Sequence, residues 1–148
     1  MNYRETMSRL NNALNLIDSA YAVIAKKHGL TFNSLMILCL IKESEHVTQK
    51  KICDELHLPK STVHSILSDF TKQEYVTLEF GNNKKEKFII FTESGSRYFS
   101  KTFDDTWAFE NKILSALGEN TCHILVEAAE KLGEIIKDDH KCQANQED

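Results

Sequence analysis

Residues 47–70 determine the architecture of this chain, and they read VTQKKICDELHLPKSTVHSILSDF. Thr48 is suited to begin the first of two short helices, because a threonine hydroxyl accepts a backbone N–H at a helix start. His57-Leu58-Pro59 predicts a turn, since proline fits a first helical turn but not a helix interior. The second helix is predicted from Lys60 to about Gln73. Two short helices joined in this way are typical of a helix-turn-helix.

A β-hairpin is predicted directly after the second helix. Residues 75–80 and 87–91 are rich in β-branched and aromatic side chains, as strands are. Gly81-Asn82-Asn83 lies between them and tolerates the positive φ that a tight hairpin needs. The tip is basic, with Lys84, Lys85 and Lys87. A helix-turn-helix followed by such a hairpin is a winged helix.

Longer helices are predicted on both sides of the winged helix, so the fold class is mainly α with a small β-hairpin wing. They cover about 3–27 and 32–42 before it, and 93–117 and the stretch from Gly118 to 137 after it, with a polar tail over 138–148. Gly29, Thr31 and Thr92 are suited to the ends of these helices.

The first helix carries an apolar stripe at spacings of three and four residues. Its members are Met7, Leu10, Leu14, Ile17, Tyr21 and Ile24. A helix of this length spans ~37 Å, more than a small domain covers, so part of the stripe needs a partner. It is either a core helix of one chain or a dimerisation helix. On the last helix, Leu125, Leu132 and Ile136 are expected to face inward.

Composition excludes several classes of protein. The 148 residues are 41% hydrophobic and 27% charged, as in one globular domain. No stretch approaches the ~20 apolar residues of a membrane span, and the N-terminus lacks a signal-peptide core. We therefore expect a cytoplasmic protein with no membrane partner. The net charge is −4, but residues 47–90 hold seven lysines and six acids, so this part is mildly electropositive.

The four cysteines form no C-x-x-C pair. Cys39 and Cys53 lie in apolar patterns and are predicted to be buried thiols rather than disulfides. A metal- or redox-sensing regulator is an alternative, because Cys122-His123 and His140-Lys141-Cys142 place ligand types together and Cys142 is the thiol expected to be exposed. No metal ligand is assigned, no cofactor is expected, and no catalytic motif is visible, so the chain is not expected to be an enzyme.

The chain resembles the MarR family of bacterial transcriptional regulators over about residues 5–138. The resemblance rests on ordered segments: Gly29-Leu30-Thr31, VTQKKICDEL at 47–56, LPKSTV at 58–63, Tyr75-Val76 and FTESG at 91–95. It implies an obligate homodimer, with 1–30 and 95–148 as the helical dimerisation region and 31–94 as the winged helix-turn-helix. It also implies a pseudo-palindromic double-stranded DNA operator as partner, and favours the dimerisation reading of the first helix.

The outward face of the second short helix is the candidate site for reading DNA. Ser61, Thr62, His64 and Ser65 are expected to reach base edges in the major groove. None of them is Arg, Asn or Gln, so specificity would come from hydroxyls, His64, thymine methyl groups and DNA shape. Phosphate contacts are expected from seven lysines: Lys50, Lys51, Lys60, Lys72, Lys84, Lys85 and Lys87.

The wing tip departs from the family pattern. Many members have Asp, any residue, then Arg, where this chain has Asn83 and Lys85. Lysine lacks the planar fork of arginine, so minor-groove reading is weaker and phosphate contact is the expectation for Lys85.

The sequence thus predicts a dimeric, sequence-specific DNA-binding regulator, more a repressor than an activator, relieved by a small ligand or another signal. Tyr21, Phe103 and Trp107 belong to a group of aromatic residues that would line the pocket for such an effector, or else form plain core. The alternative function from another class is a winged-helix module that binds proteins.

Overall fold

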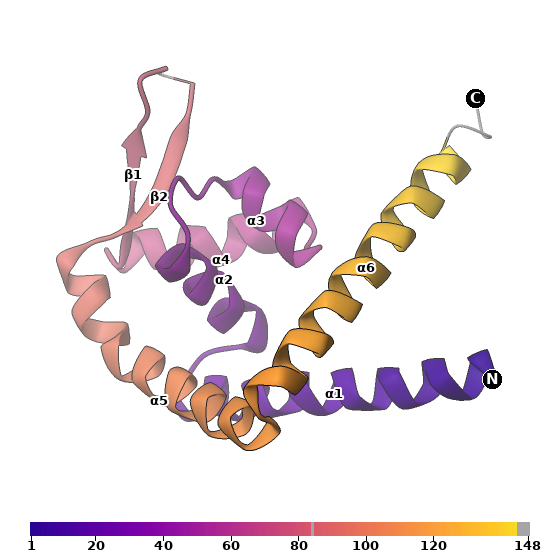
Figure 1. The fold of residues 1–148 in the computed structure, drawn as a ribbon. Coiled ribbons are helices and arrows are strands. Elements are labelled where there is room, and N and C mark those ends of the chain that lie inside the picture. The colour runs from indigo at the N-terminus through magenta and orange to yellow at the C-terminus, as the bar shows by residue number, and fades with distance from the viewer. Residues whose placement is uncertain (84, 145–148) are drawn as a thin grey trace. The chain divides into compact units, whose positions relative to one another are not determined.

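The computed structural model describes residues 1–83 and 85–144. In this part of the chain the order is α1 (Tyr3–Lys27), α2 (Phe32–Glu43), α3 (Gln49–Leu56), α4 (Lys60–Lys72), β1 (Val76–Phe80), β2 (Lys87–Phe91), α5 (Glu93–Leu117) and α6 (Glu119–Ala144) (Figure 1). The predicted fold class, mainly α with a hairpin wing, is confirmed. The chain divides into two compact units, with the boundary inside α5 between Thr106 and Trp107. The division by function, with 31–94 as the DNA-binding region, stays a prediction.

The core of the first unit lies around α2. The most deeply buried side chains come from several helices: Leu35, Ile37 and Leu38 of α2, Ile52 of α3, Val63 of α4 and Phe99 of α5. The Phe99 ring also contacts Phe70 at a centroid distance of 5.6 Å and Tyr75 at 5.1 Å. Each such buried side chain contributes ~1.5–3 kcal/mol relative to an exposed one. This core holds α3 and α4 in fixed positions.

Three threonines begin helices by the same hydrogen bond. Each hydroxyl accepts the backbone N–H three residues on: Thr31 from Ser34 at 3.1 Å, Thr48 from Lys51 at 3.1 Å, and Thr92 from Gly95 at 2.9 Å. Each satisfies one donor that has no partner inside the helix. The predicted starts of these helices are confirmed, as is Gly29 at the end of α1, with a φ of +70°.

The last helix is longer than the sequence prediction. We expected it to end near Lys137, but α6 continues to Ala144, so a polar tail over 138–144 is wrong. This segment contains neither proline nor glycine, and its lysine, glutamine and alanine favour helix. Nothing in it therefore ends the helix.

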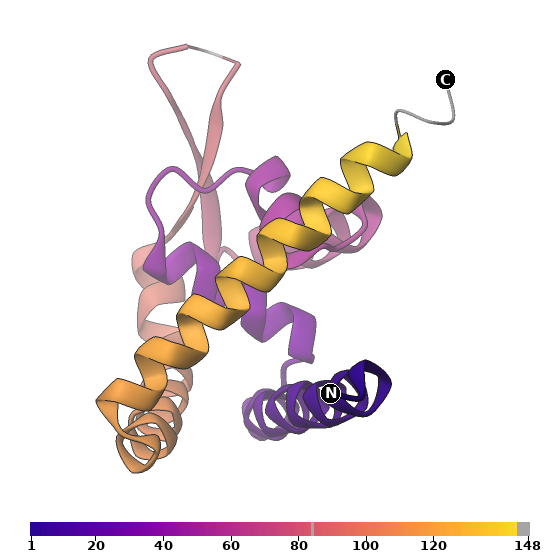
Figure 2. The same ribbon diagram turned by 45° about the vertical axis from the view of Figure 1, so that its right-hand side comes forward.

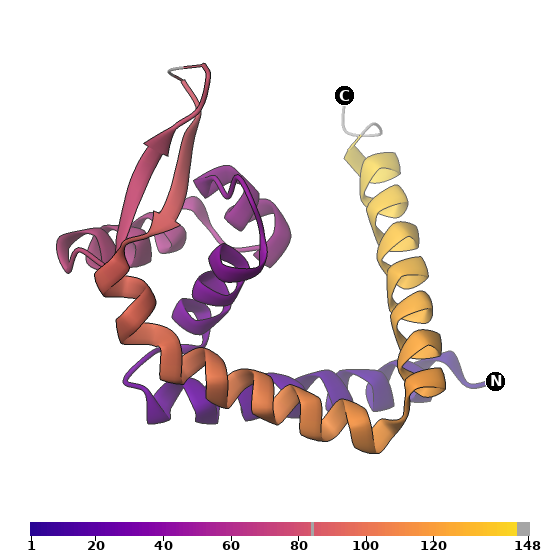
Figure 3. The ribbon, with the colours of Figure 1, turned by 60° about the vertical axis from the view of Figure 1, so that its left-hand side comes forward.

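The hairpin projects beyond the helices of the first unit, as Figures 2 and 3 show from two sides. Its strands pair antiparallel, from Val76 opposite Phe91 to Phe80 opposite Lys87. The loop covers residues 81–86, and Gly81 N–H donates to Glu86 O at 3.0 Å. The positive φ expected over residues 81–83 is not found. The chain reverses with a hydrogen bond from Glu86 N–H to Asn83 O at 2.9 Å, as in a β-turn.

Much of the apolar surface of the long helices is open in the single chain. On α1, the side chains of Met7, Leu14 and Ile17 are 48%, 48% and 43% exposed. The inward direction predicted for α6 is wrong within one chain, because Leu125 is 51% and Ile136 46% exposed. The second unit holds only the end of α5 and α6, so within this unit no other element covers their apolar side chains.

The cysteines differ from the prediction in burial and agree with it in chemistry. Cys39, Cys53 and Cys122 are in no disulfide, and Cys39 and Cys53 are half-buried rather than buried. Cys142 lies beyond the described side chains. Within residues 1–83 and 85–144, no helix is long and apolar enough to cross a membrane.

Candidate nucleic-acid interface

Helix α4 presents the polar face that the sequence predicts. Val63, Leu67 and Phe70 are buried, which fixes the rotation of the helix about its axis. Ser61, His64 and Ser65 are consequently exposed, while Thr62 is half-buried. The structure therefore places three of the four expected base-reading side chains on one open surface and leaves Thr62 at its edge.

The turn between α3 and α4 is held at both ends. His57 ends α3 in the left-handed region, at φ +51° and ψ +40°, and Pro59 precedes the first turn of α4. The Gln49 side chain donates from Nε2 to Lys60 O at 3.4 Å, which links the starts of the two helices. Sequence analysis missed this role of Gln49, since a contact across a turn has no local pattern.

Three of the predicted phosphate-binding lysines are paired with acids on their own helices. Lys50 meets Asp54 at 2.5 Å, Lys51 meets Glu55 at 3.8 Å, and Lys72 meets Asp69 at 4.0 Å. The hydrogen bond and the charge of Asp54 raise the pKa of Lys50. Exposed pairs of this kind stabilise a helix only weakly, so a phosphate can displace them.

The remaining predicted lysines differ in their surroundings. Lys60 is exposed and makes no ion pair among the described residues. Lys85 is exposed, and its backbone N–H donates to Asn83 Oδ1 at 3.1 Å. Lys87 Nζ lies 5.9 Å from the centroid of the Phe80 ring across the strand pair. Lys84 lies outside the described residues.

The wing is fastened to the helices at its base. Ile89 N–H donates to Val47 O at 2.8 Å, which joins β2 to the segment before α3. The Thr92 hydroxyl donates to Glu74 O at 2.6 Å and accepts the Gly95 N–H at 2.9 Å. The start and the end of the hairpin are thus tied to the first turn of α5. The sequence predicted Thr92 as a helix cap but not its bond to Glu74.

A groove of about 460 Å³ separates α4 from the wing. Its floor is apolar, with Leu67 of α4 and Val76, Leu78 and Ile89 of the wing. The polar rim comes from both sides: Gln49, His64, Ser68, Thr71, Lys72 and Lys87. Predicted DNA-contacting residues of α4 and of β2 therefore border one continuous surface.

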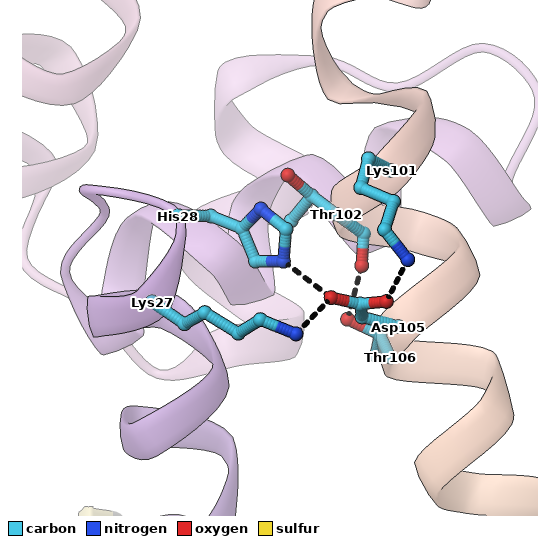
Figure 4. A network of polar contacts seen from close by, with 6 residues as sticks. All are labelled: Lys27, His28, Lys101, Thr102, Asp105 and Thr106. Atoms are coloured by element: carbon cyan, nitrogen blue, oxygen red, sulfur yellow. Dashed lines mark hydrogen bonds and ion pairs between the residues drawn. The ribbon is translucent and has the colours of Figure 1, made fainter.

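A polar network joins the end of α1 to α5 (Figure 4). One Asp105 oxygen accepts from Lys27 Nζ at 2.6 Å and lies 3.0 Å from His28 Nε2, and the other accepts from Lys101 Nζ at 2.5 Å. The hydrogen bonds from Lys101 and Lys27 hold the pKa of Asp105 well below its ordinary value, although burial opposes them. The Lys101–Asp105 spacing is visible in the sequence, but the partners on α1 are not.

The aromatic residues predicted for an effector pocket do not line the cavities described here. Phe103 is 3% exposed, and its ring packs against Phe91 at a centroid distance of 5.7 Å, as a core residue does. Tyr21 and Trp107 are half-buried. Among the described residues, no group of three or more His, Cys, Asp or Glu side chains is placed to hold a metal ion.

Residues 28–85 match the model of the MarR family. No curated protein matches the sequence. A MarR family regulator from Neisseria meningitidis shares the fold with a TM-score of 0.78 and 22% identity, over 93% of this chain and 96% of that one. A putative MarR family regulator from Listeria monocytogenes, complexed with 26mer DNA, gives 0.73 and 22%, over 90% and 89%.

A third structure with this fold carries a small molecule. CouR from Rhodococcus jostii RHA1, bound to p-coumaroyl-CoA, gives a TM-score of 0.72 at 16% identity, over 88% of this chain and 91% of that one. The family match covers α2, α3, α4 and β1 and ends before β2, so it includes the face of α4 but not Lys87. Residues 28–85 thus match the MarR family model, and the chain shares its fold over nearly its whole length with structures of MarR family regulators.

Proposed function

We propose that this protein is a dimeric, sequence-specific DNA-binding transcriptional regulator, a repressor that a small ligand releases from its operator. One observation carries the proposal: the exposed face of α4, with Ser61, His64 and Ser65, lies beside a wing that bears exposed lysines. The Listeria structure, in which a chain of this fold is complexed with 26mer DNA, supports it.

The α4 face supplies direct readout of bases. The major groove admits an α-helix, and side chains near its N-terminus reach base edges. Hydroxyls of Ser61 and Ser65 donate to or accept from any base, while the His64 imidazole offers one donor and one acceptor. Thr62 at the edge of the surface contacts a thymine methyl group or the backbone.

The lysines supply the phosphate contacts. Lys60, Lys85 and Lys87 are available to bind phosphates, since none of them is ion-paired among the described residues. Lys50, Lys51 and Lys72 exchange an intrahelical carboxylate for a phosphate. Lys84 extends the same basic tip in the sequence. Each phosphate contact releases a counterion, so binding weakens as salt rises.

The open apolar stripe of α1 supports a homodimer. Met7, Leu14 and Ile17 would expose a long apolar surface in a lone chain, which stable monomers avoid. A second copy that covers the stripe also supplies a second α4. A two-fold pair of reading helices fits half-sites about one helical turn apart, ~34 Å, and hence a pseudo-palindromic operator.

The effector is proposed to act by preferring one spacing of the two reading helices over another. Tyr21, Phe103 and Trp107 remain the residues proposed for its pocket; Tyr21 and Trp107 are half-buried, and Phe103 is buried. The p-coumaroyl-CoA complex of CouR shows a chain of this fold with a small molecule bound.

The direct test is a salt titration of DNA binding. The full chain is titrated against labelled duplex from upstream of its own gene and against a random duplex of equal length. We expect the logarithm of the association constant to fall linearly with the logarithm of the salt concentration, with a slope of about −0.9 per phosphate contact. We also expect a clear preference for the upstream duplex. A slope near zero, or no preference, contradicts the proposal.

Two substitutions separate reading from positioning. His64→Ala should cost ~1–3 kcal/mol with the native operator and relax its preference at one base pair. Lys60→Ala should weaken all sequences alike and reduce the salt slope by about one contact. Arg97→Ala, on the exposed side of α5 and paired with Glu93, is the control and should change neither.

A protein-interaction module is the second candidate. It is favoured by the three lysines that are neutralised by neighbouring acids and by the net charge of −4. Replacement of Lys84, Lys85 and Lys87 by Glu distinguishes the two. Loss of operator binding supports the DNA function, whereas unchanged regulation and partner binding exclude a DNA role for the wing.

A further inference from the structure

A second cleft lies on the wing, and the proposed DNA contacts do not use it. It is formed by the end of α2, the connection through Glu45 and His46, and the hairpin, and its volume is about 800 Å³. The His46 ring lies 4.7 Å from that of Phe88, and the Ile89–Val47 hydrogen bond closes the base. The two sides of the cleft are thereby held together.

The charge of this cleft is negative. Glu45, Glu79 and Glu86 line it and are exposed, and none makes an ion pair in the part of the chain that the structure describes. Among the residues that the structure describes, no lysine or arginine lines it. On its elements, Lys87 Nζ lies 5.9 Å from the centroid of the Phe80 ring, which pairs with Lys87 on the face of the hairpin opposite Glu79 and Phe88, and Lys42 lies over Phe103 at 5.8 Å. Such a surface repels phosphate and attracts a cation.

Aromatic and aliphatic side chains lie between the carboxylates. Ile90 is 38% exposed, and Phe88 is half-buried in the lining beside the His46 ring. The face of an aromatic ring attracts an organic ammonium group, most strongly where water is excluded. Carboxylates and rings together therefore suit a charged group attached to an apolar body.

Gly81 makes room for this arrangement. A Cβ at Gly81 would lie 2.9 Å from Glu86 Oε2 and 2.9 Å from Phe88 Cε2. The carboxylate and the ring thus meet over a residue that has no side chain. Because Gly81 has no positive φ, space is what the position requires.

We propose that this cleft binds an organic cation: a protonated or quaternary ammonium or phosphonium centre on an apolar, preferably aromatic, body. Its volume lies within the ~300–1,000 Å³ of small-molecule sites. The bound cation contacts both the wing and the segment before α3, so it alters the position of the wing relative to α4. Binding itself does not depend on the proposed DNA function, whereas this regulatory effect rests on it.

Binding is tested by calorimetry on the full chain with tetraphenylphosphonium. Tetraphenylborate, of the same shape and opposite charge, is the matched probe. We expect the phosphonium to bind and the borate to bind at least tenfold more weakly. Equal binding of both ions, or no binding of the phosphonium up to its solubility limit, overturns the proposal.

Variants test whether the phosphonium binds in this cleft. The triple change Glu45→Gln, Glu79→Gln and Glu86→Gln should weaken phosphonium binding at least tenfold, and Phe88→Leu should weaken it about threefold. A triple Glu→Gln change at 127, 130 and 134 alters net charge equally on exposed positions of α6 and should leave binding unchanged. Chromatography checks that each variant keeps the wild-type oligomeric state. Equal weakening by both triple changes refutes the cleft as the site.

The two proposals fail separately. If the chain binds its operator but not the phosphonium, only the proposed cation site is wrong. If the phosphonium binds and the three cleft carboxylates control its binding, but the chain does not prefer its operator, only the proposed DNA function is wrong. When both hold, the phosphonium should shift operator affinity in the wild type and not in the cleft triple variant; an equal shift in both overturns the regulatory effect.

Discussion

Gly95 lies directly against the backbone of Tyr75, so closely that a Cβ at Gly95 would stand 1.9 Å from the Tyr75 carbonyl oxygen. Gly95 is buried in the first turn of α5, and its N–H is held by Thr92. The first turn of α5 can approach the start of the hairpin only because this position has no side chain. The contact sets where the wing leaves the helical body.

The Gly95→Ala variant should therefore be destabilised. A methyl group at this site meets main-chain atoms that cannot move aside, and overpacking of this kind costs ~1–3 kcal/mol or more. Urea unfolding followed by circular dichroism measures the loss. Ser96→Ala, exposed on the next position of α5, is the control and should stay within ~0.5 kcal/mol of the wild type. Equal stability of Gly95→Ala and the wild type would disprove the steric argument.

Asp54→Asn should tighten DNA binding. The change releases Lys50 from its exposed 2.5 Å ion pair, which stabilises the free chain only weakly, so a gain of about twofold is expected at low salt. Anisotropy with the operator duplex measures it. Asp104→Asn on α5 changes the net charge equally and should have no comparable effect. A gain of the same size in both would mean that net charge alone acts.

Asp105 should make folding sensitive to acid. Because Lys101, Lys27 and His28 lower its pKa in the folded chain, the unfolded state takes up the proton first as pH falls. The stabilisation is complete above the unfolded pKa of about 3.9 and declines below it, towards the folded value. The stability difference between wild type and Asp105→Asn should therefore shrink from pH 5 to pH 3.

Urea titrations at both pH values measure this difference. Asp104→Asn, next in sequence and exposed, controls for the loss of one surface carboxylate. A difference that does not change with pH would show that packing, rather than the charge of Asp105, links α1 to α5.

Ile17→Glu should separate the proposed dimer. It places a charge in the open stripe of α1, where Ile17 is 43% exposed in the single chain, and an unpaired charge in a buried interface is costly. Sedimentation should show a smaller species, and operator affinity should fall because one reading helix binds half a site. Asn15→Glu lies on the opposite face and should sediment as the wild type. A stable Ile17→Glu dimer would exclude the stripe as the interface.

Local patterns in the sequence were enough to place most of the helices and strands. The threonines at 31, 48 and 92 begin helices because hydroxyl capping acts over three residues. The burial of Val63 and Leu67 follows from helical periodicity, and with it the exposure of Ser61 and Ser65.

Contacts between distant residues could not be predicted in this way. The pairing of Asp105 with Lys27 and His28 spans more than 70 residues, and periodicity carries no information on it. The separation of the charged residues on the wing depends on how the two strands pair. Lys87 lies opposite Phe80 on one face of the hairpin, while Glu79 lies opposite Phe88 on the other. The sequence prediction ends α6 too early, because it assigns the polar segment after residue 137 to an unfolded tail.

The Thr92 hydroxyl donates to Glu74 O and accepts from Gly95 N–H, so the start of α5 is the fulcrum about which the hairpin can rotate. Five strand residues extend ~17 Å, so a rotation of about 10° at this fulcrum carries the far end of the strands through ~3 Å. That displacement matches the length of a hydrogen bond. A small rotation of α5 is thus enough to move the end of the wing away from a DNA groove that it had contacted.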